Sequence, residues 1–319
     1  MIPHRGSAAT APQAAPLELT GLSRVFATPS GPFIAVKDVN ALVDAGEFVT
    51  ILGHSGCGKS TVLSIVAGLD RATLGGVVID GKEVTGPGPE RAIVFQTPCL
   101  LPWLTARQNV QIAATQGATP RTRHDAMAAA DHYLELVGIG DAADQLPAQL
   151  SLGTQQCVSL ARALVVEPRF LLLDEPFSQL DSLTRFELQD LLLRVWESPC
   201  AEVTGDNSAS ADVTAEKRHE PARSLGEGEA DKTVIMVTHD IDEALYLSDW
   251  LILMTDGPEA TIGDVLEVPF PRPRARRTVL AHSEYQSCRR RVIDFLEHHA
   301  HQSRPSALDT LLHAQAQSQ

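Results

Sequence analysis

The sequence predicts an α/β fold in which helices cover a mainly parallel β-sheet. Mainly apolar runs within 47–53, 170–174 and 233–238 are typical of strands that are buried on both faces. Helical patterns at 58–69 and 183–196 alternate with these strands along the chain, as they do in β-α-β units. The chain has 319 residues, 44% of them hydrophobic, which is enough for one large packed core.

Two further regions extend this predicted core. Residues 17–50 alternate apolar and polar side chains between Gly and Pro residues, which predicts an antiparallel β-subdomain made of short strands. The pattern from about 97 to 165 is mostly helical and rich in Ala, which indicates an inserted α-helical subdomain. The remaining predictions are strands at 77–80 and 92–95, a strand-turn-strand at 253–267 and a helix at about 278–300.

The domain organisation follows from shifts in composition. The main domain is predicted at 17–270, after an Ala/Pro-rich lead at 1–16 that lacks the apolar run of a signal peptide and is expected to be disordered. Residues 198–231 carry eight acidic and three basic residues, and they predict a disordered insertion. Residues 271–319 begin with a basic stretch and predict a helical extension with a tail.

Charge and composition exclude several classes of protein. The chain has 40 acidic and 26 basic residues, a formal net charge of −14, so we expect no nucleic-acid partner. No run of about 18 apolar residues predicts a segment that spans a bilayer. The five cysteines lie far apart without a CxxC spacing, which favours isolated thiols in a reducing compartment over disulfides or a zinc site.

The most specific motif runs from Gly53 to Thr61 and matches GxxxxGK[ST]. It follows a predicted strand and opens a predicted helix, so backbone N–H groups and the helix N-terminus can surround phosphates. Lys59 would place its charge on the β- and γ-phosphates, and the Ser60 hydroxyl would ligate Mg²⁺. The predicted nucleotide-binding residues of this loop are Gly53, His54, Ser55, Gly56, Cys57, Gly58, Lys59, Ser60 and Thr61.

Two acidic residues end the buried strand at 170–174. The carboxyl edge of such a strand is where α/β folds bind their ligands. Asp174 would hold Mg²⁺, directly or through water, and Glu175 would orient and polarise an attacking water molecule. Together with the phosphate loop, this pair predicts hydrolysis of a nucleoside triphosphate with ATP and Mg²⁺ as the cofactors.

Five further segments in the same order narrow the class. Leu150-Ser-Leu-Gly-Thr-Gln-Gln156 resembles the LSGGQ signature of ABC ATPases, and Ser178-Gln-Leu-Asp181 is similar to their D-loop. Gln96 resembles the glutamine of the Q-loop, His239 the switch histidine, and Phe26 the aromatic residue that stacks on adenine. The resemblance to the ABC ATPase family covers about residues 17–270.

The resemblance implies a P-loop NTPase (RecA-like) core and a site shared between two copies of the domain. The opposing copy would supply Ser151 and the N–H groups around Gly153 to the γ-phosphate. By the same resemblance the expected catalytic residues are Glu175, His239 and Gln96. The expected metal ligands are Ser60, Gln96 and Asp174, and the expected further nucleotide contacts are Phe26, Ser151, Gly153 and Asp181.

The signature departs from the family pattern at two positions. Leu152 replaces the first signature glycine, and Cys157 replaces the usual basic residue after the signature glutamine. If the family backbone needs a positive φ here, leucine would weaken the contact with phosphate, since its Cβ disfavours that conformation. If only the N–H group matters, leucine is tolerated. A weakly hydrolysing regulatory protein therefore stays open as an alternative.

Two segments resemble importer ATPases. The stretch VFQTPCLLPWLTARQNV at 94–110 is similar to the nitrate/sulfonate/taurine group, and its apolar part either packs in the core or meets a permease. Residues 253–267 and 271–274 resemble the nitrate, nitrite and cyanate members. This implies uptake of a small anion, nitrate or nitrite first, with cyanate or sulfonate/taurine as alternatives.

An importer of this kind implies partners and a location. We expect transmembrane permease subunits, a dimer of ATPase subunits and, indirectly, a periplasmic substrate-binding protein, with this chain peripheral on the cytoplasmic face of the inner membrane. Soluble ABC ATPases of DNA repair or translation usually have two cassettes or long coiled coils. This chain has one cassette and no sustained heptads, which argues against that class.

Overall fold

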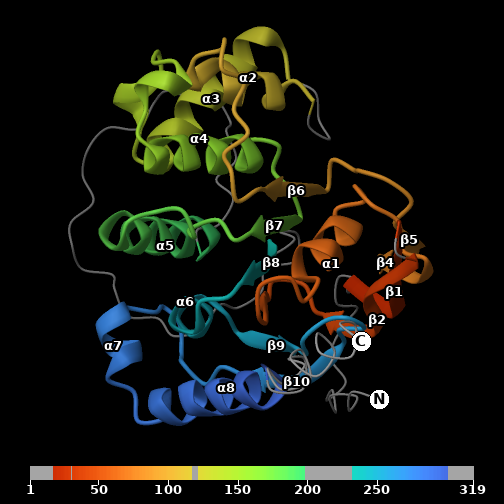
Figure 1. Cartoon of the computed structure of the whole chain (residues 1–319). Coiled ribbons are helices and arrows are strands. Elements are labelled where there is room, and N and C mark those ends of the chain that lie inside the picture. The colour runs from red at the N-terminus through yellow and green to blue at the C-terminus, as the bar shows by residue number, and fades with distance from the viewer. Residues whose placement is uncertain (1–16, 30, 117–120, 198–231, 301–319) are drawn as a thin grey trace, which may run out of the picture.

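The structure is a computed structural model that describes residues 17–29, 31–116, 121–197 and 232–300. The predicted N-terminal lead, the acidic insertion at 198–231 and the tail after residue 300 lie outside these residues. Two sheets and several helical layers make up the described part (Figure 1).

The central sheet has six strands in the order β10-β9-β3-β8-β7-β6. Strands β9, β3, β8, β7 and β6 are parallel to one another, and β10 pairs antiparallel with β9 at one edge. The predicted parallel core is therefore confirmed. The strands are β3 (Phe48–Leu52), β6 (Arg91–Val94), β7 (Phe170–Asp174), β8 (Thr233–Thr238), β9 (Trp250–Met254) and β10 (Ile262–Glu267).

The second sheet is antiparallel, with the order β2-β1-β4-β5. Its strands are β1 (Leu17–Thr28), β2 (Gly31–Val43), β4 (Leu74–Ile79) and β5 (Lys82–Glu83). The prediction of short strands at 17–50 was wrong, because β1 and β2 have 12 and 13 residues. Irregular register within β1 interrupts the alternation of its side chains, and Gly21 at φ 57° lies in that stretch.

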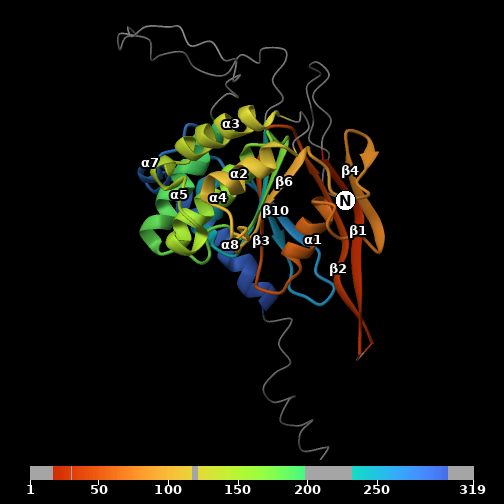
Figure 2. The same ribbon diagram turned by 90° about the horizontal axis from the view of Figure 1, so that it is seen from above.

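Helix α1 (Lys59–Val66) lies between the two sheets (Figure 2). Its buried side chains Val62, Leu63 and Val66 belong to one apolar cluster with residues of both sheets. The packing therefore fixes the start of α1 against the end of β3.

A block of helices covers the β6 end of the central sheet (Figure 1). It contains α2 (Ala106–Ala114), α3 (Arg123–Leu136) and α4 (Leu152–Leu164), with 3-10 turns at Gly140–Ala142 and Pro147–Gln149. The side chains of Thr105, Thr122 and Ser151 accept backbone hydrogen bonds at the three helix starts.

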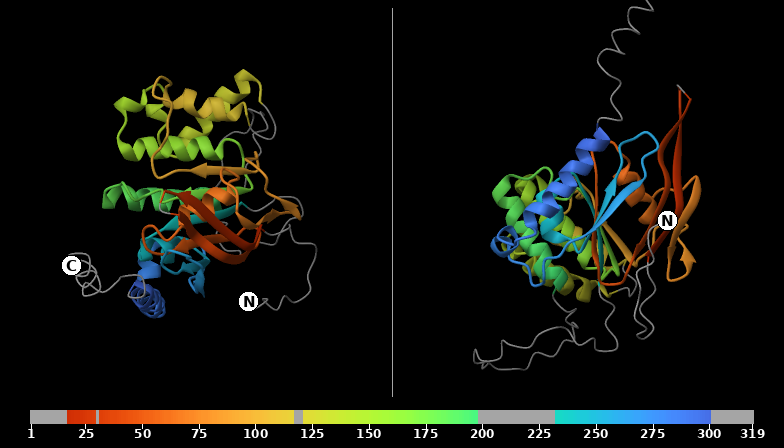
Figure 3. Two further views of the ribbon diagram at one scale, coloured as in Figure 1. Left: turned by 45° about the vertical axis from the view of Figure 1, so that its right-hand side comes forward. Right: turned by 90° about the horizontal axis from the view of Figure 1, so that it is seen from below.

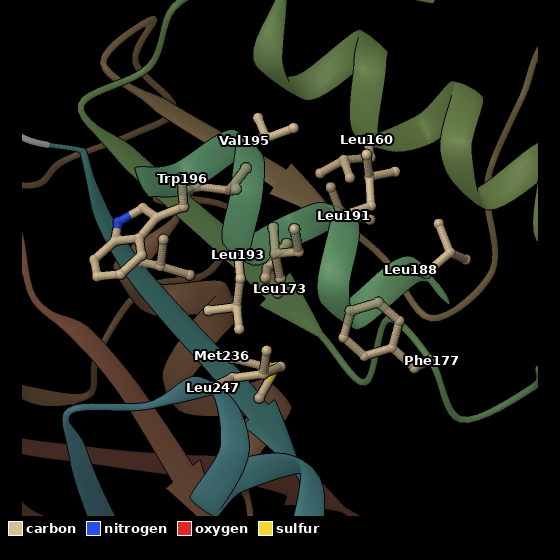
Figure 4. Packing of buried hydrophobic residues seen from close by; sticks show 14 of the residues in the cluster. Leu160, Leu173, Phe177, Leu188, Leu191, Leu193, Val195, Trp196, Met236 and Leu247 are labelled. Atoms are coloured by element: carbon tan, nitrogen blue, oxygen red, sulfur yellow. The ribbon is translucent and has the colours of Figure 1, made fainter. Parts of the chain in front are cut away.

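Helix α5 (Ser182–Glu197) packs its leucines against β7 and β8 (Figure 4). The shorter α6 (Ile241–Leu247) follows β8, and the chain ends its described part with α7 (Arg276–Leu280) and α8 (Tyr285–Ala300) along one side of the molecule (Figure 3). The helix predicted at about 278–300 is present as α8, but its predicted start was wrong, since α7 ends at residue 280 and the chain turns before residue 285. Helix α6 was not predicted.

Trp196 joins the end of α5 to the start of β8. Its Nε1–H donates to the carbonyl oxygen of Lys232 at 2.7 Å, and its ring meets Phe48 edge to face at 5.6 Å. The Arg272 guanidinium lies over the same ring, 4.0 Å from its centroid. The two chain ends that flank residues 198–231 are therefore held together.

Among the described helices, none has the length and apolar character needed to cross a membrane.

Candidate functional site: a nucleotide-binding loop beside two carboxylates

The loop between β3 and α1 is shaped by glycine and held by lysine. Gly58 has φ 96°, and a Cβ there would lie 2.5 Å from the Val36 side chain, so other residues are excluded by both backbone and space. The Lys59 side chain is buried, and its Nζ donates to the carbonyl oxygens of Gly53 at 2.8 Å and His54 at 2.9 Å. The ammonium is thereby enclosed by the loop itself.

The turn between β9 and β10 braces the same loop. His54 Nδ1 lies 2.8 Å from Asp256 Oδ1, within hydrogen-bond distance, and Gly257 follows against the backbone of Gly56 and Cys57. Burial raises the pKa of the Cys57 thiol and keeps it protonated. Sequence reasoning missed Asp256, since no motif spacing connects it with a loop about 200 residues earlier.

Ser60 and Asp174 meet at the mouth of the loop. The Ser60 hydroxyl donates to Asp174 Oδ1 at 2.7 Å, and burial raises the pKa of Asp174, an effect that this hydrogen bond and Lys59 oppose. Mg²⁺ takes oxygen ligands and typically keeps several waters while it bridges to phosphates. One hydroxyl and one carboxylate beside a phosphate loop fit that requirement.

Glu175 stands next to Asp174 in a strained backbone conformation. Its φ is 44°, and its N–H donates to the carbonyl oxygen of Val237 at 3.0 Å, which ties β7 to β8 at this point. His239 Nδ1 lies 3.2 Å from Glu175 Oε2, and the His239 side chain is half exposed. Strain of this kind in a carboxylate residue is common at catalytic positions.

Gln96 approaches Glu175 from the other side. Its Nε2 donates to the Ser178 hydroxyl at 3.0 Å, and that hydroxyl donates to the Glu175 carbonyl oxygen at 3.0 Å. The Gln96 side chain is exposed.

The order of the parallel strands explains why these groups meet. Strands β6, β7, β8 and β3 are neighbours, and each is followed at its carboxyl end by a predicted site residue. Gln96 follows β6, Glu175 follows β7, His239 follows β8, and the loop with exposed Ser55 and partly buried Thr61 connects β3 with α1. The edge therefore gathers residues from four distant stretches of sequence.

Three of the predicted residues belong to a different part of the surface. Ser151 and Gly153 start α4, while Asp181 precedes α5 and accepts the backbone N–H groups of Leu183 and Thr184, both at 3.1 Å. A Cβ on Gly153 would lie 2.5 Å from Thr184 Cγ2, so the two helix starts are in close contact. Within the described ranges, no hydrogen bond links Ser151 or Gly153 to the phosphate loop.

Phe26 lies at the far end of β1, opposite Phe33 of β2. The Arg24 guanidinium lies over one face of its ring, 4.5 Å from the centroid, and pairs with Asp70 at 2.8 Å. Phe26 is partly buried, and an aromatic ring that is fixed in this way can stack on a base.

Leu152 is the first residue of α4 and has no unusual backbone. The Ser151 side chain accepts the N–H of Thr154 at 3.1 Å, so α4 begins as an ordinary capped helix, and Leu152 is not among the described residues with positive φ. Its side chain is 37% exposed. The hypothesis that leucine distorts the signature therefore finds no support, because the N–H groups of the first turn keep their helical directions.

We expect Leu152→Gly to leave ATP turnover unchanged or to lower it. Glycine restores no donor here and destabilises the helix by about 0.5–1 kcal/mol. Steady-state turnover at saturating ATP and the melting temperature of both proteins check this, with Leu152→Ala as the control that shortens the side chain and keeps a Cβ. A clear gain in turnover for glycine alone would contradict the observed geometry.

Comparison with known proteins decides the family. A sequence model described as "ABC transporter" matches residues 36–178. The chain is 44% identical over 275 residues to the nitrate import ATP-binding protein NrtD of Synechococcus elongatus, covering 86% of this chain and 89% of that protein. This chain belongs to the ABC transporter family. It is also 41% identical over 280 residues to the bicarbonate transport ATP-binding protein CmpD of Synechocystis, covering 88% of each.

A solved structure of the ABC family has the same fold. The dimeric post-hydrolysis structure of the ATP-binding cassette MJ0796, bound to ADP and Pi, aligns with a TM-score of 0.62 and 28% identity, covering 80% of this chain and all of that one. The predicted fold class and the prediction of an ABC-type ATP-binding subunit with ATPase activity are thus confirmed.

Proposed function

We propose that this chain is the MgATP-hydrolysing subunit of an importer for a small anion. The observation that carries the proposal is the gathering of Lys59, Ser60, Asp174, Glu175 and His239 at one sheet edge in a chain related to anion importers. Hydrolysis at such an edge consists mainly of positioning and charge stabilisation.

Each group has a role that its position supports. Lys59 and the loop N–H groups bind the β- and γ-phosphates. Ser60, Asp174 and Gln96 would hold Mg²⁺, which would neutralise phosphate charge. Glu175 polarises the attacking water. His239, whose Nδ1 lies 3.2 Å from Glu175 Oε2, orients the Glu175 carboxylate. Phe26 stacks on adenine.

The surface at the starts of α4 and α5 completes the site of a second subunit. Ser151, Gly153 and Asp181 lie together there and outside the hydrogen-bond network of the phosphate loop. A helix N-terminus stabilises a negatively charged group, so α4 of one subunit serves the γ-phosphate bound by the other. The dimeric state of the MJ0796 structure supports this arrangement.

The permease contact falls on the helical block. Trp103, in the stretch 94–110 whose apolar residues the sequence left open between core and partner, is 71% exposed, and Ile112 of α2, just after that stretch, is 46% exposed. Leu100 packs against the core, so the stretch serves both purposes. This block would face permease subunits at the cytoplasmic face of the inner membrane, with a periplasmic binding protein acting through them.

The names of the relatives point to two anions, nitrate and bicarbonate. Nitrate comes first because it belongs to the relative with 44% identity and to the resemblance at 253–267; bicarbonate is an alternative that the sequence had not suggested. Nitrite, cyanate and sulfonate or taurine remain the substrates next in order.

The test is uptake by the assembled transporter. In vesicles that contain MgATP and in which this chain is assembled with a permease and a binding protein, labelled nitrate should accumulate, and bicarbonate, cyanate and taurine should accumulate less. Vesicles that carry Glu175→Gln are the control for ATP dependence. Uptake of another of these anions in preference to nitrate would overturn the substrate, and uptake without ATP would overturn the function.

A further inference from the structure

A buried carboxylate sits one helical turn beyond His239. Glu243 on α6 is 5% exposed, and its Oε2 accepts a hydrogen bond from Gln189 Nε2 of α5 at 2.8 Å. The Thr238 hydroxyl, at the end of β8, also hydrogen-bonds to Glu243. The proposed reaction does not use this carboxylate. Burying an ionised carboxylate costs free energy of folding, so its presence here calls for an explanation.

Glu243 contacts both neighbours of His239, Thr238 through its carboxylate and Asp240 through its backbone N–H. The N–H of Asp240 donates to the Thr238 hydroxyl at 3.1 Å, and the N–H of Glu243 donates to Asp240 Oδ1 at 3.0 Å. Thr238 and Asp240 are the residues immediately before and after His239. When Glu243 is ionised, its carboxylate accepts a hydrogen bond from the Thr238 hydroxyl. The oxygen of that hydroxyl is then free to accept the N–H of Asp240, so each hydrogen bond in this network has a defined donor and acceptor.

A contact with helix α7 fixes the orientation of the Gln189 side-chain amide. Gln189 is 1% exposed, and its Oε1 accepts a hydrogen bond from the Arg276 guanidinium of α7 at 2.8 Å. A guanidinium can only donate, so the amide oxygen must face Arg276 and the amide NH₂ must face Glu243. Arg276 is itself fixed between the rings of Phe186 and Tyr246, at 4.3 and 4.0 Å from their centroids.

We propose that Arg276, Gln189 and Glu243 are positioning residues through which the C-terminal helices hold His239 in place beside Glu175. The inference deepens the proposed function, on which it rests. It assigns a role in ATP hydrolysis to residues after 270, which lie beyond the last motif of the cassette.

Protonation of Glu243 would disrupt this chain of bonds. Burial raises the pKa of Glu243 to about 7, while the hydrogen bonds from Thr238 and Gln189 act in the opposite direction and favour the ionised form. If Gln189 no longer donates, the pKa of Glu243 rises further and the carboxyl group is protonated at higher pH. Strands β3 and β8 bring no titratable side chain. Arg185 of α5 pairs at 3.1 Å with Asp240, the N-cap of α6, and Asp190 of α5 accepts from Tyr246 of α6 and from Arg276 of α7. Tyr285 and Arg289 of α8 bond to Asp242 of α6.

The experiment measures MgATPase activity of the assembled transporter from pH 6 to 9. Arg276→Met should lower kcat at pH 7 by about tenfold, since small misplacements of a reacting geometry reduce rates by up to about 100-fold. The KM for ATP should stay within about twofold of wild type. The acidic limb of the pH profile, which is the fall in kcat on going to low pH, should move to higher pH because Glu243 is protonated there. Arg276→Lys should recover most of the rate, because lysine can still donate to Gln189.

Two further variants make the result decisive. Arg277→Met, the exposed neighbour on α7, is the matched control and should behave as wild type. Glu243→Gln removes the titrating group, so its kcat should be low and its acidic limb lost; it also serves if Arg276→Met does not fold. A wild-type profile for Arg276→Met, or an acidic limb that persists in Glu243→Gln, would overturn the inference. Absence of ATPase activity in the wild-type transporter would instead overturn the proposed function.

Discussion

Glu175→Gln should bind MgATP with near wild-type affinity and hydrolyse it at least about 100-fold more slowly. The glutamine keeps the size of the side chain and leaves the phosphate loop untouched, but it cannot polarise the water molecule. It also loses the charge that faces His239 at 3.2 Å. The expected result is a stable ATP-bound dimer, since closure no longer ends in hydrolysis.

Nucleotide binding by fluorescence titration, single-turnover hydrolysis and size-exclusion chromatography measure the three parts of this expectation. Glu83→Gln is the matched control, since Glu83 is exposed on β5 in the antiparallel sheet. Turnover of Glu175→Gln at the wild-type rate would remove Glu175 from the catalytic role, and loss of binding would mean that the variant disturbs the loop.

Lys59→Ala should weaken MgATP binding by about 10- to 100-fold, which corresponds to the loss of about one hydrogen bond to a charged group. The ammonium is enclosed by the carbonyl oxygens of Gly53 and His54 and lies at the N-terminus of α1. Alanine removes this charge and leaves the anion with backbone donors alone.

Isothermal titration with MgATP measures the affinity, and thermal unfolding without nucleotide shows whether the loop survives. Lys37→Ala is the control, because Lys37 is an exposed lysine that pairs with Glu259. Lys37→Ala should bind as wild type. An affinity of Lys59→Ala within about twofold of wild type would count against the phosphate site.

The parallel core could be predicted because its signals are local. Residues 170–173 and 234–237 are apolar throughout, and the strands observed at 170–174 and 233–238 have the same bounds as those predicted. The antiparallel strands were harder, since irregular pairing in β1 hides their length. Helix α6 has only seven residues, although Asp240 with Glu243 three positions later is a start signal that could have revealed it.

The phosphate loop, Asp174, Glu175 and His239 were predicted as site residues because each belongs to a short sequence motif at the end of a predicted strand. The partners Asp256, Gln189 and Arg276 were not, because their importance comes from contacts across about 50 to 200 residues of sequence. A glutamine at 189 or an arginine at 276 looks like any other helical surface residue. Burial and direction of hydrogen bonding are visible only after folding.

The bond between Trp196 and Lys232 has a practical consequence for labelling. This hydrogen bond joins the end of α5 to the residue before β8. The register of β8 with β3 and β7 therefore does not depend on the number of residues between 197 and 232. Since the cost of closing a loop grows only slowly with its length, an affinity tag or fluorophore-bearing peptide inserted between 198 and 231 should leave catalysis unaffected. The same position offers an attachment point for following subunit closure by energy transfer without a probe at either terminus.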